Sequence, residues 1–343
     1  MSTFVHTMEM PRKVVIGSRI LGEVPGVLKD LDLSAPVVLC DKNTYDIAGR
    51  TVSESLGAKV IYSGDATYEE VESIEKSLPE GTDVVIGVGG GTVIDLAKLA
   101  SRLRNIPFIS IPTAASHDGI ASSRASIRSK GQKTSIKALP PIAIVADTSI
   151  IVGAPYRYLA AGCADLISNY SAVRDWELAY RLKGEYFSEY ANQLSLLSAK
   201  LMIKNAKIIR EHNERSVRKV IKGLISSGIA MSIAGSSRPA SGSEHLFSHA
   251  LDQIAPHPAM HGEQCGVGTI LMMYLHGGKW NSIRKALKTV KAPTNAEELG
   301  IDGEYILKAL TMAHTIRDRY TILGDNGLTN EAAATLARNT GVI

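Results

Sequence analysis

The first half of the chain alternates short apolar runs with longer amphipathic stretches. Each apolar run is rich in Val and Ile and is too short for a helix, as expected of strands buried in a parallel sheet. We predict strands over residues 13–17, 35–41, 59–64, 83–90, 106–113 and 141–147. Their alternation with helix-length segments favours a doubly wound, Rossmann-like α/β sheet.

The pattern changes near residue 155, where strand-like runs stop. The stretch 192–212, for example, repeats its apolar residues at helical spacing. We therefore predict a dinucleotide-binding α/β domain over residues 1–155 and an all-α domain that binds metal and substrate over residues 156–343. The cleft between two such domains is the expected place for an active site.

Composition narrows the class of protein. The 343 residues are 45% hydrophobic and 21% charged, and the net charge of +4 is spread along the chain. This distribution argues against nucleic-acid binding and is compatible with anionic small molecules. Three dispersed cysteines without a CxxC motif fit a reducing compartment. Because no apolar run reaches the roughly 20 residues of a membrane span, we expect a cytoplasmic protein without membrane insertion.

The stretch GVGGGTVIDLAK, residues 87–98, joins a predicted strand to a predicted helix. Glycines at that turn let backbone amides approach a pyrophosphate, with help from the helix dipole. Gly89, Gly90, Gly91 and Thr92 fit this role, while Asp95 either caps the helix or contacts a cofactor. A tight turn without a ligand is the alternative, since the GxGxxG fingerprint is absent.

Two further loops support a nucleotide site. Asp41 ends a predicted strand, where a carboxylate either receives ribose hydroxyls or caps the next turn. The segment IPTAASHDG, residues 111–119, places Thr113, Ser116, His117 and Asp118 after another strand. Together with the glycine turn, these loops lie at one predicted sheet edge and favour a bound nucleotide.

Histidines in the second half indicate a metal site. His245 and His249 are four residues apart, so a helix places them on one face, and His261 follows a proline-containing loop. A catalytic zinc needs about three protein ligands and an open position. Asp165, in an apolar stretch of small residues, is the candidate carboxylate ligand. Ordinary histidines and a helix-capping Asp165 are the alternatives.

Five motifs, in order, resemble those of the archaeal glycerol-1-phosphate dehydrogenases. They are GVGGGTVIDLAK, IPTAASHDG, GCADLISN, GSEHLFSH and MHGEQCGVGT. The resemblance extends from about residue 10 to at least residue 275. It places the chain in the wider group of glycerol dehydrogenases and metal-dependent alcohol dehydrogenases.

The resemblance implies an activity and a set of site residues. Members of the family reduce dihydroxyacetone phosphate to sn-glycerol 1-phosphate with NADH or NADPH, a step toward archaeal ether lipids. It implies zinc ligands at Asp165, His245 and His261, substrate contacts at Asp118, Asp165 and His249, and a homo-oligomer. The implied cofactor contacts are Gly91, Thr92, Val93, Ile94, Asp95, Thr113, Ala114, Ala115, Ser116 and Ser122.

The residues agree with this chemistry. Zinc would polarise the ketone oxygen while the nicotinamide supplies hydride. His249, one turn from His245, would deliver a proton or orient a substrate hydroxyl, and the usual pKa of histidine, about 6.5, suits either role. Iron-type relatives carry a histidine four residues after the aspartate, where this chain has Asn169. That difference leaves three protein ligands and favours a chelating polyol.

The substrate phosphate and the competing functions stay open at this stage. The candidate phosphate ligands are Arg124, Arg128, Lys130, Lys133, Lys137 and Arg238, and the sequence does not choose among them or between NAD and NADP. Glycerol dehydrogenase is the main alternative. A dehydroquinate-synthase-like enzyme and a metal- or nucleotide-binding module without catalysis are the others.

Overall fold

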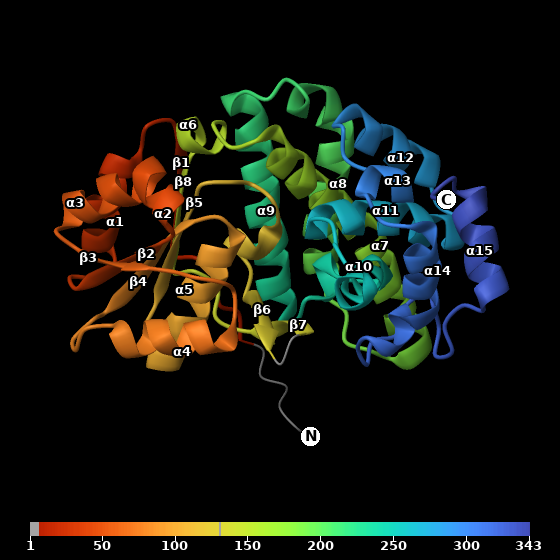
Figure 1. The fold of residues 1–343 in the computed structure, drawn as a ribbon, viewed down its shortest axis with the longest axis horizontal. Helices are drawn as coiled ribbons and strands as arrows, with labels where there is room; N and C mark the ends of the chain where they lie inside the picture. Colours follow the sequence, from red (N-terminus) through yellow and green to blue (C-terminus); the bar gives the residue numbers. More distant parts are fainter. Residues whose placement is uncertain (1–6, 130–131) are drawn as a thin grey trace.

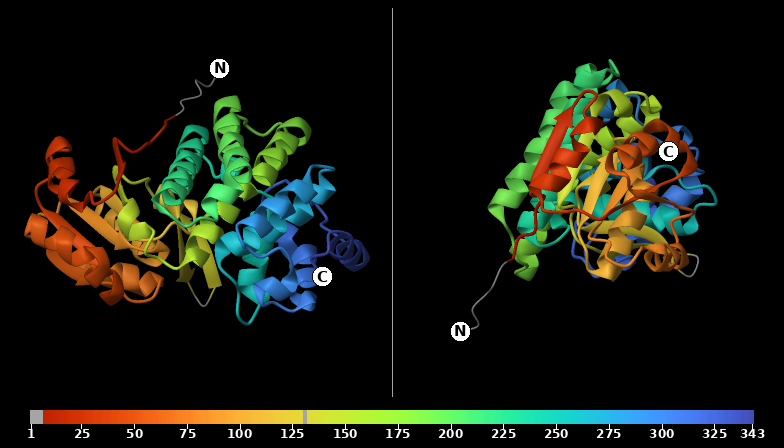
Figure 2. Two further views of the ribbon diagram at one scale, coloured as in Figure 1. Left: turned by 90° about the horizontal axis from the view of Figure 1, so that it is seen from above. Right: turned by 90° about the vertical axis from the view of Figure 1, so that its left-hand side faces the viewer.

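A computed structural model describes residues 7–129 and 132–343 (Figure 1). The N-terminal part forms a sheet flanked by helices, and the C-terminal part is a group of helices beside it. Figure 2 shows the same side-by-side arrangement from two more directions.

The sheet has six parallel strands in the order β1-β8-β5-β4-β2-β3. The strands are β1 (Lys13–Gly17), β2 (Pro36–Cys40), β3 (Lys59–Tyr62), β4 (Val84–Gly89), β5 (Phe108–Pro112) and β8 (Ala143–Asp147). All six predicted strands and the doubly wound class are therefore confirmed. In the central pair, Gly89 at the end of β4 lies opposite Pro112 at the end of β5. The segments that follow these two strands thus leave the sheet side by side.

Helices cover both faces of the sheet. They are η1 (Leu21–Glu23), α1 (Val24–Asp30), α2 (Lys42–Thr44), η2 (Tyr45–Gly49), α3 (Arg50–Leu56), α4 (Tyr68–Ser77), α5 (Gly91–Arg104), η3 (Asp118–Ile120) and α6 (Thr148–Ile151). Alternate β2 side chains enter opposite cores: Val37 and Leu39 pack with α4 and α5, whereas Val38 and Cys40 pack with α1 and α3. This two-sided burial explains the nearly continuous apolar character of the strands.

A two-stranded hairpin interrupts the sheet sequence between β5 and β8. Strands β6 (Arg124–Ser129) and β7 (Gln132–Lys137) pair antiparallel. The hairpin packs against α5 on one side and reaches α10 (Ser243–Ile254) on the other, so it lies between the two halves (Figure 1). Of the basic residues predicted as phosphate ligands, Lys130 lies outside the described residues.

From Tyr156 onward, the described residues form helices and connecting segments, as predicted. The helices are α7 (Tyr156–Lys183), α8 (Glu189–Ile209), α9 (Glu214–Ala234), η4 (Arg238–Ala240), α10, α11 (His261–Leu275), α12 (Trp280–Thr289), α13 (Ala296–Leu299), α14 (Gly303–Met312), η5 (Ala313–Thr315) and α15 (Asn330–Asn339). The domain boundary at residue 155 stays a prediction. None of the helices formed by the described residues has the length and apolarity needed to cross a bilayer.

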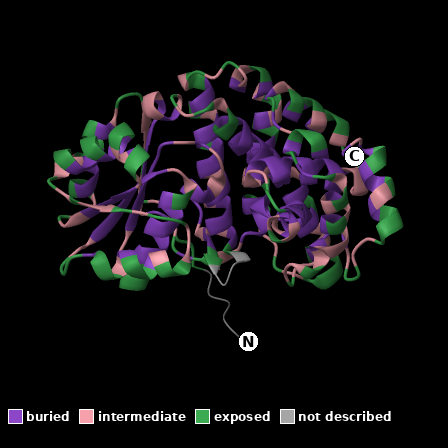
Figure 3. Ribbon diagram, in the orientation of Figure 1, coloured by how far each residue is buried: buried purple, intermediate pink, exposed green. Residues whose placement is uncertain are grey.

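The centre of the helical half is α11, which packs against α7 and α10. Every residue from Gly262 to Met273 is buried, so this helix is enclosed on all sides (Figure 3). One apolar core runs from the sheet face under α5 into these helices. Polar side chains along α7, α10 and α11 are thus held in rigid surroundings.

Candidate active site

Three helices bring the predicted metal ligands together. Asp165 lies within α7, His245 in the first turn of α10, and His261 is the first residue of α11. The close approach of α11 to α7 depends on Gly262, where a Cβ atom would lie 2.1 Å from the carbonyl oxygen of Ala161. Asp165 does not cap a helix, which removes the alternative that the sequence left open.

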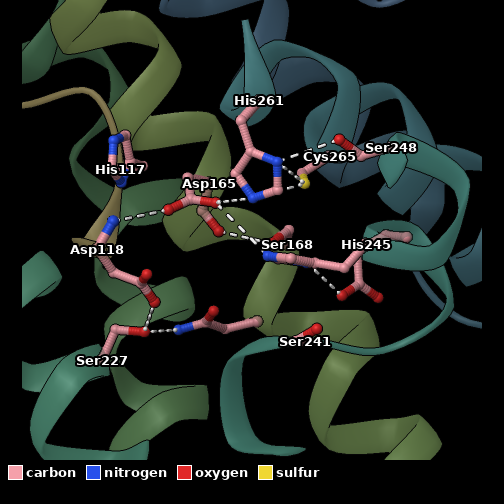
Figure 4. Close-up of polar contacts among 12 residues, drawn as sticks. His117, Asp118, Asp165, Ser168, Ser227, Ser241, His245, Ser248, His261 and Cys265 are labelled. Atoms are coloured by element: carbon pink, nitrogen blue, oxygen red, sulfur yellow. Dashed lines mark hydrogen bonds and ion pairs between the residues drawn. The ribbon is translucent and has the colours of Figure 1, made fainter. Parts of the chain in front are cut away.

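The donor atoms of this cluster face a common centre (Figure 4). Asp165 Oδ1 is 3.9 Å from His245 Nε2 and 3.8 Å from His261 Nε2. The two imidazole centroids are 4.8 Å apart. Together with Cys265, one turn along α11 from His261, these residues place their ligand atoms within 4.8 Å of one another. We call Asp165, His245, His261 and Cys265 the donor cluster.

Neighbouring groups orient each donor. Glu244 Oε1 lies 2.9 Å from His245 Nδ1, and Ser248 Oγ lies 3.1 Å from His261 Nδ1. The Asp118 amide donates to Asp165 Oδ2 at 3.0 Å. With Glu244 as acceptor, His245 donates from Nδ1 and turns Nε2, the nitrogen that would bind a metal, toward Asp165. Such outer contacts are typical of metal sites.

Burial shifts the pKa values of residues in the donor cluster and leaves one carboxylate oxygen without a partner. Desolvation, with the nearby Asp118 charge second, raises the pKa of Asp165 to about 7. Its Oδ1 atom is buried and accepts no hydrogen bond. Burial alone would lower the pKa of His245, but Cys265 and Glu244 outweigh that effect and raise it well above the ordinary value. A cation at the centre would supply the partner that Asp165 Oδ1 lacks.

Cys265 is a donor that sequence reasoning missed. Its Sγ atom lies 3.6 Å from His261 Nε2, and burial raises the pKa of its thiol to about 11. The spacing of four residues after His261 was the available indication, because it places both side chains on one helix face.

The predicted glycine turn leads into α5, with Gly90 as the N-cap residue. No heavy atom lies within 4 Å of the place where a Gly90 Cβ would stand, whereas a Cβ on Gly91 would lie 2.2 Å from His117 Nε2. Thr92 is exposed, but Val93 and Ile94 are buried in the core. Any contact from Val93 or Ile94 to a cofactor would therefore come from the backbone.

Two carboxylates predicted as cofactor contacts have structural partners. Asp41 accepts from the Thr44 amide at 2.8 Å and caps α2, the alternative noted from the sequence. Asp95 Oδ2 accepts from the Ser126 amide at 2.8 Å, and Oδ1 lies 3.4 Å from Lys98 Nζ. These contacts anchor the hairpin on α5. Direct cofactor binding by either carboxylate stays a prediction.

The loop after β5 connects the glycine turn to the donor cluster. The Thr113 amide donates to Gly89 O at 3.0 Å, and Asp118 reaches Asp165 as described above. Between them, Ala115 O packs so tightly on α7 that a Cβ on Gly162 would lie 2.0 Å away. The other predicted contacts in this region are Ala114 and Ser116, which are partly exposed, and Ser122, which is buried.

Comparisons with known proteins decide the family. Residues 15–155 match the family described as iron-containing alcohol dehydrogenase. The glycerol-1-phosphate dehydrogenase [NAD(P)+] of Thermococcus sibiricus is 60% identical over 100% of both chains. The enzyme of that name from Pyrococcus furiosus is 56% identical over 99% of this chain and 100% of its own. The chain belongs to the glycerol-1-phosphate dehydrogenase family. It is therefore an oxidoreductase, as the motifs predicted.

Solved structures agree on the fold. Glycerol dehydrogenase from Schizosaccharomyces pombe superposes with a TM-score of 0.82 at 24% identity, covering 98% of this chain and 91% of that one. A probable glycerol dehydrogenase from Sinorhizobium meliloti also gives 0.82, at 20% identity over 99% and 100% of the chains. At these identities the likeness establishes the fold alone.

Within this family fold, Asn169 has a role distinct from a metal ligand. Its Nδ2 atom donates to Ser227 Oγ at 3.1 Å, and Ser227 Oγ donates to Asp118 Oδ2 at 2.9 Å. This chain of hydrogen bonds fixes the Asp118 carboxylate beside Asp165 (Figure 4). The residue that departs from the iron-type pattern thus positions a predicted substrate contact.

His249 lies beside the donor cluster, but its ionisation differs from the expectation. Its ring stacks on that of His261 with centroids 5.7 Å apart. Burial lowers the pKa of His249 to about 4, and the charge of Arg317 adds to the effect. The ordinary histidine value therefore does not apply to this ring, because desolvation favours its neutral form. Orienting a substrate hydroxyl fits this ring better than donating a proton.

Arg238 is already paired. Its guanidinium binds both carboxylate oxygens of Glu185, with Nε 2.6 Å from Oε1, and the arginine is 4% exposed. Because Glu185 already occupies the two N–H groups that would bind a phosphate side by side, this buried guanidinium group is not available to the substrate. Arg238 is therefore set aside as a phosphate ligand.

Proposed function

We propose that the protein catalyses the reversible, zinc-dependent reduction of dihydroxyacetone phosphate to sn-glycerol 1-phosphate with NADH or NADPH. The product would supply the glycerophosphate backbone of archaeal ether phospholipids. The observation that carries this proposal is that Asp165, His245 and His261 converge within the donor cluster, in a chain 60% identical to an enzyme named for this reaction.

The donor set fits a zinc ion. One carboxylate and two imidazoles are common zinc ligands, and three protein ligands leave a position for substrate. The orphaned Asp165 Oδ1 and the Glu244–His245 contact are the features such a site requires. When bound, zinc supplies a Lewis acid for the ketone oxygen.

The chain's own residues would position the substrate. His249, neutral at pH 7, orients a hydroxyl of the bound triose, and Asp118 accepts from another hydroxyl while Ser227 holds it in place. Asp165 thus contributes to the metal site and the substrate site together. Behind the cluster, α7 and α11 pack so closely at Gly262 that even a Cβ atom there would meet the backbone of Ala161.

The cofactor would bind along the carboxyl ends of β4 and β5. NAD(P)H supplies the hydride that reaches the ketone carbon. Backbone amides from Gly89 to Thr92, with the open space at Gly90, accommodate a pyrophosphate at the start of α5. The segment Thr113–Ser116 and Ser122 complete the cofactor site in this proposal.

We further propose that the protein works in the cytoplasm as a homo-oligomer. All three cysteines are free and buried, which fits a reducing compartment. Large apolar side chains are exposed on α8, including Tyr190, Leu197 and Leu201, and suit contact with another subunit.

The deciding experiment is NADH and NADPH oxidation by zinc-loaded protein with dihydroxyacetone phosphate or dihydroxyacetone, repeated after chelation. We expect a strong preference for the phosphate ester that chelation removes and zinc restores. A preference for dihydroxyacetone would instead assign glycerol dehydrogenase. Activity on neither ketone would reopen the dehydroquinate-synthase-like function and a role without catalysis.

A further inference from the structure

Arg317 lies next to the candidate active site. It follows η5, which packs against α10, the helix of His245 and His249. Its Nη2 atom lies 3.0 Å from His249 Nε2. Because a guanidinium only donates, His249 Nε2 is the acceptor and the ring proton is on Nδ1. One imidazole therefore separates Arg317 from the donor cluster.

Arg124 belongs to another element that reaches α10. It begins β6, in the hairpin whose second strand packs against α10. Lys98 Nζ donates to Arg124 O at 2.5 Å, which fixes the backbone from which its side chain extends. Burial, followed by the charge of Arg124, lowers the pKa of Arg317. The two guanidinium groups therefore repel each other electrostatically, although one belongs to the hairpin of the N-terminal half and the other to the helical half of the chain.

The positive charge of this pair is not balanced by neighbouring acids. Across the described residues, no carboxylate oxygen lies within 4.0 Å of a guanidinium nitrogen of Arg317 or Arg124. Asp252 faces the other nitrogen of His249, with 3.8 Å between Oδ2 and Nδ1.

Two nearby arginines already have oxygen partners. Arg238 binds the carboxylate of Glu185, and Arg319, which has no acid beside it, donates to Ser241 O and, at 2.9 Å, to Ser237 Oγ. Two partly buried guanidinium groups without an acid are costly unless an anion joins them.

We propose that Arg317 and Arg124 bind the phosphate group of the substrate, with Arg317 as the principal ligand. This inference rests on the proposed function, since it assigns one end of the same substrate. A phosphate monoester carries the charge and the oxygen geometry that an arginine fork recognises. With its ketone at the donor cluster, a three-carbon phosphate extends past His249 to Arg317. The pair would thereby determine the preference for phosphorylated over free triose.

The test compares three variants of the full-length, zinc-loaded protein with the wild type: Arg317→Gln, Arg124→Gln and the control Arg102→Gln. Arg102 lies in the last turn of α5, is exposed, and is not one of the candidate phosphate ligands. Steady-state kinetics with dihydroxyacetone phosphate and with dihydroxyacetone are measured for each, together with inhibition by inorganic phosphate.

We expect Arg317→Gln to lower kcat/KM for the phosphate ester roughly 100-fold, mainly through KM, and Arg124→Gln roughly tenfold. Rates with dihydroxyacetone should change less than about threefold, and inhibition by phosphate should weaken in parallel with the KM effect. Arg102→Gln should match the wild type in all three measurements.

A merely structural Arg317, acting only by holding His249, would slow both ketones equally and leave phosphate inhibition intact. That result would overturn the proposal. If Arg317→Gln does not fold, Arg124→Gln and its phosphate inhibition decide the question alone. A wild type that does not prefer the phosphate ester would refute the proposed function itself. A wild-type preference retained in both variants would refute only this inference.

Discussion

The donor cluster and the glycine turn are built in opposite ways. At the donor cluster, side chains from three helices converge, and Glu244, Ser248 and the Asp118 amide restrain them. At the glycine turn, residues 89–91 carry no side chains of their own, and open space lies beside Gly90. The first site consists of side-chain atoms that point at a common centre, and the second of backbone groups that a ligand can approach only if no side chain is in the way. Substitutions should therefore disable the first by removing atoms and the second by adding them.

The largest effect should come from the donor cluster itself. His261→Ala removes one imidazole ligand, and we expect kcat/KM to fall roughly a thousandfold, because Lewis-acid stabilisation is worth several kcal/mol. Metal content per chain, measured by elemental analysis, should fall with it. His257→Ala, an exposed histidine in the preceding loop, is the control. Full activity in metal-free His261→Ala protein would refute the assignment.

At the glycine turn, Gly90→Val adds bulk where the structure has room for it. We expect the cofactor KM to rise more than about tenfold, because losing one charge-assisted hydrogen bond costs roughly 1.5–3 kcal/mol. The melting temperature should change no more than in Gly26→Val, a substitution at an exposed helical glycine that also has open space. An unchanged cofactor KM in the folded variant would show that no pyrophosphate binds there.

A third prediction tests whether the contact between Glu244 and His245 contributes to metal binding. Glu244→Gln weakens the acceptor of His245 Nδ1, and we expect metal affinity to drop about 10- to 100-fold. Competition with a chromogenic chelator measures this affinity. Glu298→Gln, which alters a glutamate bonded to Thr294, should leave metal affinity unchanged. Equal affinities in the two variants would argue against the role of Glu244.

The smallest effect is expected at Ser227. Ser227→Ala removes the hydroxyl between Asn169 and Asp118. Loss of one hydrogen bond of about 0.5–1.5 kcal/mol should reduce kcat roughly three- to tenfold while metal content stays at the wild-type level. Ser226→Ala, next to it in sequence and only partly buried, provides the comparison. A loss of metal in Ser227→Ala would mean that Asp165, as well as Asp118, depends on this hydroxyl.

The sequence predicted the elements better than their contacts. Buried strands were recognisable because β4 and its neighbours are apolar on both faces, and the helical half because its apolar residues repeat with helical spacing. His245 and His249 share a helix and were therefore related by spacing alone. Asp165 is 80 residues from His245, so no spacing related the two; its apolar surroundings made it a candidate, and the family resemblance supported the choice.

Other site features depended on tertiary packing and were not predicted. Arg317 meets His249 across 68 positions of sequence, and no local pattern encodes such an encounter. The depressed pKa of His249 has the same origin, because it reflects burial among helices. Asp41 and Asp95 both occupy their predicted places, but Asp41 is held by the neighbouring Thr44 and Asp95 by Ser126 of the hairpin, 31 positions away.

The buried ammonium group of Lys98 restricts the length of the segment between residues 119 and 124. It donates to Gly119 O at 2.8 Å and to Arg124 O at 2.5 Å while lying beside Asp95 on its own helix. A single ammonium group thus fixes the positions of the carbonyls of residues 119 and 124 relative to each other and to α5. A single inserted residue there would move one carbonyl out of reach and leave a buried charge unsolvated. Homologous chains should consequently keep this segment at constant length and place their insertions elsewhere.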